Sequence, residues 1–298
     1  LKALEVIYEI LDRGLTDGLK IESEGFGYLS ETAVSKNLID LFFQSETVKK
    51  ETGILDSSIQ PMKIRSAAVV GAGVMGAGIA QLLADREIPV RLKDVHEQAV
   101  AKGLFHAREI FEKGVLRKRL SQRDLVRKMN FIAPSTEFYG FRKIDLVIEA
   151  VVEDLEIKRK LFETLESKVR GETVLATNTS SLSISEIGAL CKNKERLIGL
   201  HFFNPVHRMP LVEIVVDPIT SAQTIATSVQ FIKELGKVPI VVKNAPGFLV
   251  NRILMPYLNE AAHLLSEGIP VSIIDEVMLD FGMPMGPFTL LDTIGIDV

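Results

Sequence analysis

The sequence predicts an α/β protein built on a Rossmann-type, doubly wound sheet, with a helical N-terminal linker and a truncated α-helical C-terminal domain. Three observations predict it. From residue 63 short apolar runs alternate with amphipathic helical runs, a glycine-rich loop joins the first strand to its helix, and helical spacing alone continues after residue 245. We therefore expect a linker over 1–62, a dinucleotide-binding domain over 63–244 and the start of a helical domain over 245–298.

The first 60 residues are expected to form two helices. Residues 1–14 carry apolar side chains at helical spacing and end at a glycine, and residues 30–50 form a second helix with Ser30 or Thr32 as its N-cap. Neither helix has an obvious partner within the segment, so they pack either on the main domain or on a neighbouring one. Since the chain begins with Leu1 rather than methionine, we expect a piece of a longer protein.

The alternating region contains short buried strands, each followed by a connection that is mostly helical. Ser183 is expected to cap one of these helices, and Gly236 to end another. The expected strands cover 64–70, 89–95, 145–151, 173–179, 196–203, 211–217 and 238–243. The expected helices cover 76–87, 96–129, 154–169, 183–190 and 221–236, and after residue 245 they cover 250–268 and 272–282.

Composition excludes several classes of function. A net charge of −4 gives no broad basic surface, so nucleic acid is not expected as a partner. The single cysteine, Cys191, excludes an internal disulfide framework and indicates a reducing compartment. No apolar run is long enough to cross a bilayer, and no signal-peptide pattern opens the chain.

The loop "GAGVMG" carries glycines at Gly71, Gly73 and Gly76, between a strand and a helix. In a dinucleotide-binding loop the first glycine permits the tight turn, the second lets the backbone approach a pyrophosphate, and the third allows close packing of helix on strand. The alternative is an ordinary turn between a strand and a helix. The context favours a dinucleotide site.

An acidic residue, Asp94, ends the second expected strand 23 positions after Gly71. This is near the spacing of about 20 residues at which a carboxylate binds the ribose 2′-hydroxyl, and it favours NAD over NADP. Arg91 and Lys93 lie nearby and weaken that preference. The alternative is a surface aspartate without a ligand.

His201 and Glu213 are the candidates for acid–base chemistry. His201 ends an expected strand, and ligands of open α/β sheets bind at the carboxyl ends of strands. Glu213 lies among aliphatic residues of the next strand, where a carboxylate needs a partner. A cross-strand pair would orient the imidazole and raise its basicity, although a purely structural ion pair explains the spacing equally well. Structural roles are expected for His96, His106 and His263.

The segment 176–184 follows another expected strand and brings Asn178, Ser180 and Ser181 to the same edge of the sheet. Their side chains can bind a substrate oxygen or the cofactor. They can equally cap the next helix, which is the commoner role of serine.

Six motifs follow one another between about residue 63 and residue 298: "GAGVMGAGIA", "VIEAVVEDLEIKRKLF", "NTSSLSI", "GLHFFNPVHRMPLVEIV", "KNAPGFLVNRIL" and "MPMGPFTLLD". In this order they closely resemble the 3-hydroxyacyl-CoA dehydrogenase family. Residues 1–60 resemble, more loosely, the linker that follows the enoyl-CoA hydratase part of multifunctional fatty-acid oxidation alpha subunits. The resemblance implies NAD-dependent oxidation of L-3-hydroxyacyl-CoA to 3-oxoacyl-CoA in fatty-acid β-oxidation, by a fragment of a multifunctional enzyme.

The resemblance also implies a role for each matching position. His201 would be the general base, Glu213 would orient it, and Ser180 and Asn251 would bind the substrate's oxygens. The cofactor site would comprise Gly71, Gly73, Met75, Gly76, Asp94, Val151, Val152, Glu153, Lys158, Ser180 and Asn204, with Met75 and Asp94 at the adenosine half and no metal.

Partners follow from the same resemblance: an acyl-CoA substrate, a thiolase subunit of a β-oxidation complex, and dimer contacts through the helical domain. The location would be cytoplasmic in a bacterium and mitochondrial or peroxisomal in a eukaryote. Two alternatives stay open, a stand-alone 3-hydroxybutyryl-CoA dehydrogenase and a catalytically silent NAD-binding relative. The 60 residues before the first strand disfavour the former, and the complete set of site residues disfavours the latter.

Overall fold

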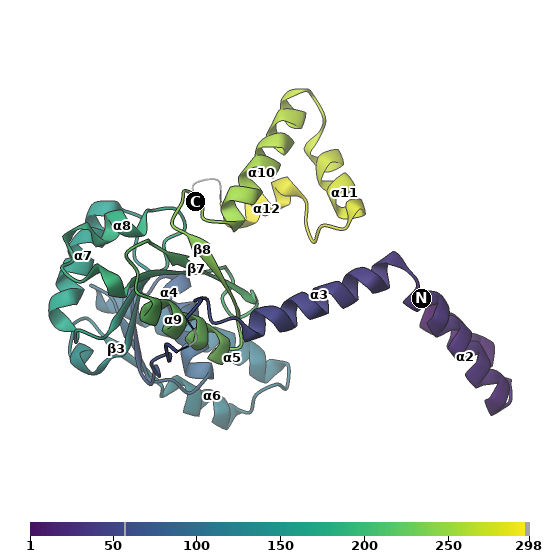
Figure 1. Cartoon of the computed structure of the whole chain (residues 1–298), viewed down its shortest axis with the longest axis horizontal. Coiled ribbons are helices and arrows are strands. Elements are labelled where there is room, and N and C mark those ends of the chain that lie inside the picture. The colour runs from purple at the N-terminus through teal and green to yellow at the C-terminus, as the bar shows by residue number, and fades with distance from the viewer. Residues whose placement is uncertain (57, 296–298) are drawn as a thin grey trace. The chain divides into compact units, whose positions relative to one another are not determined.

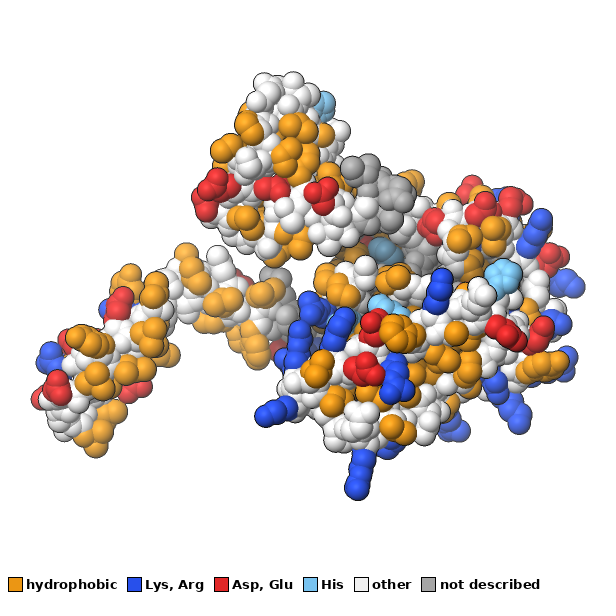
Figure 2. All heavy atoms as spheres, turned by 180° about the vertical axis from the view of Figure 1, so that it is seen from behind, with side chains coloured by type: hydrophobic (Ala, Val, Ile, Leu, Met, Phe, Trp, Pro, Cys, Tyr) orange, Lys and Arg blue, Asp and Glu red, His pale blue; other side chains and the backbone are white. Residues whose placement is uncertain are grey.

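The computed structural model describes residues 1–56 and 58–295, and the chain divides into two compact units, Leu1–Glu51 and Thr52–Val298. The first unit is helical (Figure 1). It consists of α1 (Lys2–Ile10), α2 (Leu15–Ser30) and α3 (Ala33–Lys50). Many apolar side chains along these helices are exposed (Figure 2). The N-cap of α3 is Thr32, whose side chain accepts a hydrogen bond from the Ser35 N–H, so the alternative cap Ser30 is wrong.

The two helices expected in this unit are present, but α2 was not expected. Its sequence contains several glycines, which usually disfavour a helix interior. Gly18 and Gly25 are its buried residues, and a Cβ on Gly25 would lie 2.7 Å from Cγ2 of Val6 in α1. Here glycine permits two helices to approach closely, a purpose that local propensity cannot reveal.

The second unit contains an eight-stranded sheet in the order β3-β2-β1-β4-β5-β6-β7-β8. All neighbouring strands are parallel except β6 and β7, and the first six have the Rossmann order. The predicted fold class is therefore confirmed. The strands are β1 Ala67–Val70, β2 Val90–Lys93, β3 Ile132–Ser135, β4 Leu146–Glu149, β5 Val174–Thr177, β6 Leu197–Phe202, β7 Leu211–Val216 and β8 Val238–Lys243.

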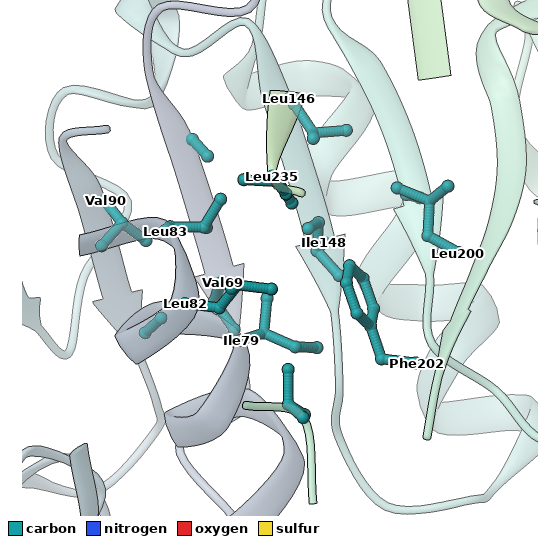
Figure 3. Close-up of a cluster of buried hydrophobic side chains, with 14 of the residues drawn as sticks. Val69, Ile79, Leu82, Leu83, Val90, Leu146, Ile148, Leu200, Phe202 and Leu235 are labelled. Atoms are coloured by element: carbon teal, nitrogen blue, oxygen red, sulfur yellow. The ribbon is translucent and has the colours of Figure 1, made fainter. Parts of the chain in front are cut away.

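Helices cover both faces of the sheet, and successive strand residues alternate between two apolar clusters. Val69 and Ile148 pack on one face with side chains of α4, α5 and α9 (Figure 3), whereas Ala68 and Val147 pack on the other with α7 and α8. The helices of this region are α4 Val74–Asp85, α5 Glu97–Leu116, α6 Gln122–Met129, α7 Leu155–Lys168, α8 Ile184–Ile187 and α9 Ala222–Glu234. Three short 3₁₀ turns are η1 Phe141–Lys143, η2 Gly188–Leu190 and η3 Lys194–Arg196.

Two details of the expected pattern were wrong. The single helix expected over 96–129 is interrupted between α5 and α6, where Lys118 has a left-handed φ of 56° and Ser121 with Asp124 forms a capping box. The strand β3 was missed because it is short and contains Pro134, which the outermost strand of the sheet tolerates.

After β8 the chain forms α10 (Val250–Ser266), α11 (Val271–Phe281) and α12 (Pro287–Ile294). The Asp275 carboxylate on α11 accepts hydrogen bonds from the amides of Phe288 and Thr289, which ties the start of α12 to α11. Domain boundaries at 62 and 245 stay a prediction. Within the described residues no helix is long and apolar enough to span a bilayer.

Candidate active site

The glycine-rich loop lies between β1 and the N-terminus of α4. Gly71 has a φ of +104°, and a Cβ there would lie 2.3 Å from the carbonyl oxygen of Ala150. A Cβ on Gly76 would lie 1.9 Å from the carbonyl oxygen of Gly71. A Cβ on Gly73 would meet nothing within 4 Å. The fold therefore requires the first and third glycines, while the second borders open space at a helix N-terminus, as a bound pyrophosphate needs.

Alanine substitutions are expected to separate these roles. Gly73→Ala should change the free energy of unfolding by less than about 1 kcal/mol, because its φ of −66° suits alanine and the space is open. It should nevertheless weaken NADH binding about tenfold or more, since the methyl group fills the space facing the loop amides. Gly76→Ala should destabilise the fold by about 3 kcal/mol. NADH fluorescence titration and urea unfolding measure both effects, and unchanged NADH affinity in Gly73→Ala would contradict the assignment.

Asp94 directly follows β2, and its carboxylate is hydrogen-bonded to the backbone of the glycine-rich loop. Its Oδ2 accepts a hydrogen bond of 2.7 Å from the Ala72 N–H, and its Oδ1 accepts one of 2.7 Å from the Val95 N–H. Each carboxylate oxygen keeps a second lone pair that a ribose hydroxyl can use. The two nearby basic residues are engaged elsewhere: the Lys93 Nζ lies 4.6 Å from the ring centroid of Phe138, and the Arg91 side chain lies against Gly140.

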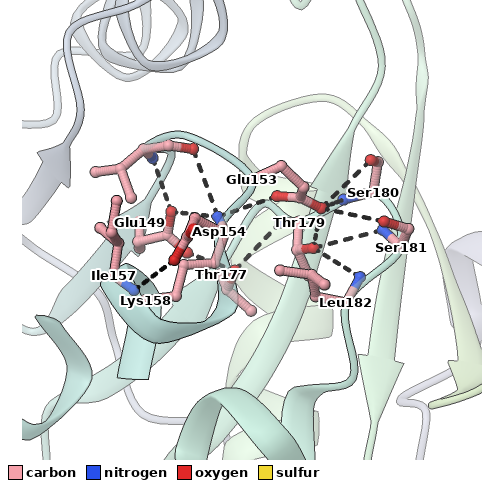
Figure 4. A network of polar contacts seen from close by, with 11 residues as sticks. Glu149, Glu153, Asp154, Ile157, Lys158, Thr177, Thr179, Ser180, Ser181 and Leu182 are labelled. Atoms are coloured by element: carbon pink, nitrogen blue, oxygen red, sulfur yellow. Dashed lines mark hydrogen bonds and ion pairs between the residues drawn. The ribbon is translucent and has the colours of Figure 1, made fainter. Parts of the chain in front are cut away.

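A polar network lies beside the ends of β4 and β5 (Figure 4). The Lys158 Nζ on α7 lies 2.6 Å from Oε1 of Glu149 and 3.2 Å from Oε2 of Glu153. Glu153 in turn accepts hydrogen bonds from the Thr179 hydroxyl and, at 3.0 Å, from the Ser180 N–H. Val151 and Val152 form the turn between Glu149 and Glu153, with Val152 exposed.

Burial alone would raise the pKa of Glu153, but this effect is outweighed. Hydrogen bonds from Thr179 and Ser180, together with the charge of Lys158, hold the pKa of Glu153 below its ordinary value. Glu153 is therefore an anion, and its hydrogen bonds connect it to the loop that carries Ser180.

His201 and Glu213 are direct cross-strand partners on the antiparallel strands β6 and β7. His201 Nδ1 lies 2.7 Å from Oε2 of Glu213, and both side chains are buried. Since a carboxylate only accepts hydrogen bonds, Nδ1 carries the proton and Nε2 keeps its lone pair; this tautomer is assigned from the contact. The Phe203 and Phe248 rings flank the imidazole, with centroids 4.6 and 5.7 Å away.

The other carboxylate oxygen of Glu213 is bound by backbone. Oε1 accepts hydrogen bonds of 2.9 Å from the amides of Leu249 and Val250, at the N-terminus of α10. Burial raises the pKa of Glu213, but the His201 hydrogen bond and these two amides outweigh it and hold that pKa below its ordinary value. The pair therefore consists of an anion and an oriented imidazole.

Acid is expected to remove the stabilisation that Glu213 provides. Its pKa in the fold lies below the ordinary value of 4.5, so its contribution is complete above about pH 4.5 and is lost as the pH falls further. The stability lost in Glu213→Gln relative to the wild type should therefore shrink as the pH falls below about 4.5. Urea unfolding at each pH measures it, and a difference that does not shrink below about pH 4.5 would contradict the bonding described.

The turn before α10 is strained. Gly247 and Phe248 have φ values of 71° and 49°, and the second is unusual for a large side chain. This conformation precedes the two amides that bind Glu213. Sequence reasoning missed both this turn and Glu149. The signal for Glu149 was the same as for Glu213, a carboxylate within an apolar strand.

The structure brings several of the predicted residues together. Asn251 Nδ2 donates a hydrogen bond of 3.3 Å to the Ser180 carbonyl oxygen. Asn178 has a structural contact, in which its Oδ1 accepts from the Phe202 N–H at 2.9 Å. Asn204 is exposed two residues after the end of β6, and Met75 is partly buried against the core.

The remaining polar residues have mostly local contacts. Ser183 stands at the N-cap position of α8, but its side chain makes no capping hydrogen bond. His96 is the N-cap residue of α5, His106 lies 3.7 Å from Glu109 on the same helix, and His263 is exposed. Among the described residues no group of three His, Cys, Asp or Glu side chains is arranged to hold a metal ion.

Two family models match the chain. The NAD-binding domain of 3-hydroxyacyl-CoA dehydrogenase matches residues 66–245, and the C-terminal domain of the same family matches residues 247–298. The chain belongs to the 3-hydroxyacyl-CoA dehydrogenase family. The predicted family and the predicted cofactor, NAD, are thereby confirmed, and the open space at Gly73 beside the anchored Asp94 fits that cofactor.

Individual relatives agree. The chain is 44% identical over 296 residues to the fatty acid oxidation complex subunit alpha of Vibrio vulnificus, covering 99% of this chain and 42% of that subunit. It is thus about two fifths as long as the curated relatives it matches. The crystal structure of (S)-3-hydroxybutyryl-CoA dehydrogenase PaaH1 from Ralstonia eutropha is 40% identical, with a TM-score of 0.76 over 79% of this chain and 84% of that one. The M. tuberculosis FadB2 structure has a TM-score of 0.77 and 35% identity at the same coverages.

Proposed function

We propose that this chain carries the NAD-dependent dehydrogenase activity that oxidises L-3-hydroxyacyl-CoA to 3-oxoacyl-CoA in fatty-acid β-oxidation. The observation that carries the proposal is the buried His201–Glu213 pair at the carboxyl edge of the sheet, with Nε2 as the nitrogen that Glu213 does not engage. Family membership gives the reaction class, and this pair supplies the base that the reaction needs.

In the oxidation, His201 Nε2 takes the proton of the substrate's 3-hydroxyl group. Glu213 accepts the hydrogen bond from Nδ1–H throughout, so it fixes the tautomer and stabilises the imidazolium that forms. Bound NAD would supply the hydride acceptor for the substrate carbon that carries this hydroxyl group. In the reverse direction the imidazolium returns its proton to the oxygen of the 3-oxo group.

Ser180 and Asn251 are proposed to bind the substrate's oxygens. Their mutual contact through the Ser180 carbonyl links the loop after β5 to the start of α10. The loop amides beyond Gly71 would hold the pyrophosphate, Asp94 the adenosine ribose, and Glu153 with Lys158 the nicotinamide side.

For the whole protein we propose an alpha subunit of a multifunctional fatty-acid oxidation enzyme. The Vibrio vulnificus subunit aligns over 99% of this chain, whereas the 3-hydroxybutyryl-CoA dehydrogenase structure covers 79%, which favours this assignment over a stand-alone enzyme. An enoyl-CoA hydratase part and a thiolase partner subunit belong to the same proposal. So do dimerisation through the helical domain and, since such relatives are bacterial, a cytoplasmic location.

The direct test is reduction of acetoacetyl-CoA by NADH with the full-length protein, with NADH binding titrated separately. Turnover with both ligands present supports the proposal. NADH binding without turnover would instead support the catalytically silent relative.

A further inference from the structure

Glu149, the last residue of β4, is fully buried and has no part in the chemistry proposed above. Its Oε1 lies 2.6 Å from the Lys158 Nζ and accepts a hydrogen bond of 2.7 Å from the Val151 N–H. Its Oε2 accepts one of 2.6 Å from the Thr177 hydroxyl. Because the carboxylate is buried, its charge determines how Lys158, the Val151 amide and the Thr177 hydroxyl are oriented.

Those partners lead to the loop that carries Ser180. Four consecutive amides of this loop, those of residues 179–182, each donate to a side-chain oxygen of the network (Figure 4). Thr177 Oγ1 accepts from the Thr179 N–H at 3.2 Å. Glu153 accepts from Ser180, and Thr179 Oγ1 accepts from the two amides that follow, at 3.4 and 3.0 Å. The backbone amides of residues 179–182 are therefore bound by side chains rather than by the backbone of a neighbouring strand or helix.

The direction of these hydrogen bonds depends on charge. A hydroxyl group has one proton to donate, and a carboxylate can only accept. Because Glu149 is a carboxylate, the Thr177 hydroxyl must donate to it and turn a lone pair to the Thr179 amide. Glu153 imposes the same direction on the Thr179 hydroxyl, and Lys158 lies between the two carboxylates.

We propose that Glu149 is a positioning residue that fixes the Ser180 loop through Thr177, Lys158 and Glu153. The proposal rests on the proposed function, in which Ser180 binds substrate. Without the charge of Glu149 the Thr177 hydroxyl no longer has to turn its lone pair to the Thr179 amide, and Lys158 is paired with Glu153 alone, so the hydrogen bonds that hold Ser180 against Asn251 weaken.

Glu149→Gln tests this in the full-length protein. Glutamine has the same shape, but its one oxygen replaces only one of the two carboxylate oxygens. If that oxygen faces Lys158 and the Val151 N–H, the NH₂ group must donate to the Thr177 hydroxyl and reverses that hydrogen bond. If it faces Thr177, the NH₂ group meets two donors that cannot accept from it. Amide hydrogen exchange of residues 179–182 should become about tenfold faster or more without any ligand. The kcat for acetoacetyl-CoA reduction should fall about 10- to 100-fold, while the pH profile set by the His201–Glu213 pair keeps its shape.

Two further variants separate positioning from stability. In Glu149→Gln/Lys158→Met the buried ammonium, which Glu153 alone would otherwise pair, is removed, so the Tm should recover while exchange at 179–182 stays altered. Exchange is the readout for this variant because Lys158 is itself part of the proposed cofactor site. Glu166→Gln is the matched control, because its carboxylate also accepts from two amides, those of Lys192 and Asn193, and pairs with Arg196. It should lower the Tm and leave loop exchange and kcat unchanged.

The results distinguish this inference from the proposed function. Wild-type exchange at residues 179–182 in Glu149→Gln would overturn the positioning role, as would recovery of wild-type exchange together with the Tm in the double variant. Absence of turnover in the wild type would contradict the proposed function, and the exchange measurement would still report on the loop.

Discussion

Replacing His201 by asparagine is expected to lower kcat for acetoacetyl-CoA reduction by about 10²- to 10⁴-fold. The asparagine amide nitrogen takes a place near the imidazole Nδ1 and can still donate to the buried Glu213, so the carboxylate keeps a partner. What is lost is Nε2, the nitrogen proposed to exchange a proton with the substrate. Steady-state kinetics with the full-length protein measure the effect.

Binding of NADH by His201→Asn should stay within about threefold of the wild type, because the glycine-rich loop and Asp94 do not contact His201. His263→Ala is the control, since this histidine is exposed on α10 and should be replaceable without loss of turnover. Turnover of His201→Asn within tenfold of the wild type would remove His201 from the proposed mechanism.

The sheet could be predicted from the sequence because its signals are local. Each buried strand is a short apolar run, and the order of strands and helices predicts a doubly wound topology. Two of the wrong details arise where a residue serves a distant contact. Gly25 of α2 packs against Val6 of α1, and Pro134 is tolerated because its strand lies at the edge of the sheet. Neither neighbour is visible in the local pattern.

In the candidate site, too, local sequence patterns predict some features, whereas others depend on residues far away in the sequence. Strand ends were enough to bring His201 and Ser180 to one edge, because the carboxyl ends of parallel strands meet there. Glu213 reaches His201 instead from the antiparallel neighbour β7. The groups that hold those side chains could not be predicted. The amides that bind Glu213 come from a segment 36 and 37 residues later, and they reach it only through the left-handed turn at Phe248.

Glu149 and Glu213 show why a buried carboxylate is informative. Each ends or lies within an apolar strand, is fully buried, and accepts hydrogen bonds from side chain and backbone together. Burying a carboxylate without partners is costly, so the sequence pattern itself predicts that partners exist. It does not predict which loops supply them.

Glu213→Gln is expected to lower kcat on the order of 10²- to 10⁴-fold, although His201 is intact. In the wild type one carboxylate oxygen accepts from the His201 Nδ1–H and the other accepts from two amides. Glutamine has one acceptor oxygen. If that oxygen faces the amides, its NH₂ group faces Nδ1 and drives the proton to Nε2, which removes the base. If it faces Nδ1, the NH₂ group meets the Leu249 and Val250 amides, and the fold loses about 1–3 kcal/mol.

Either orientation has a measurable consequence, and the two are distinguishable. Loss of kcat with wild-type stability indicates the wrong tautomer, whereas a lower free energy of unfolding with faster amide exchange at Leu249 and Val250 indicates that α10 has lost its acceptor. The Glu166→Gln variant again serves as the control. The Glu166 carboxylate accepts hydrogen bonds from two amides, those of Lys192 and Asn193, and not from His201, so its replacement should affect stability alone. A Glu213→Gln protein with both wild-type turnover and wild-type stability would show that this carboxylate neither orients His201 nor anchors α10.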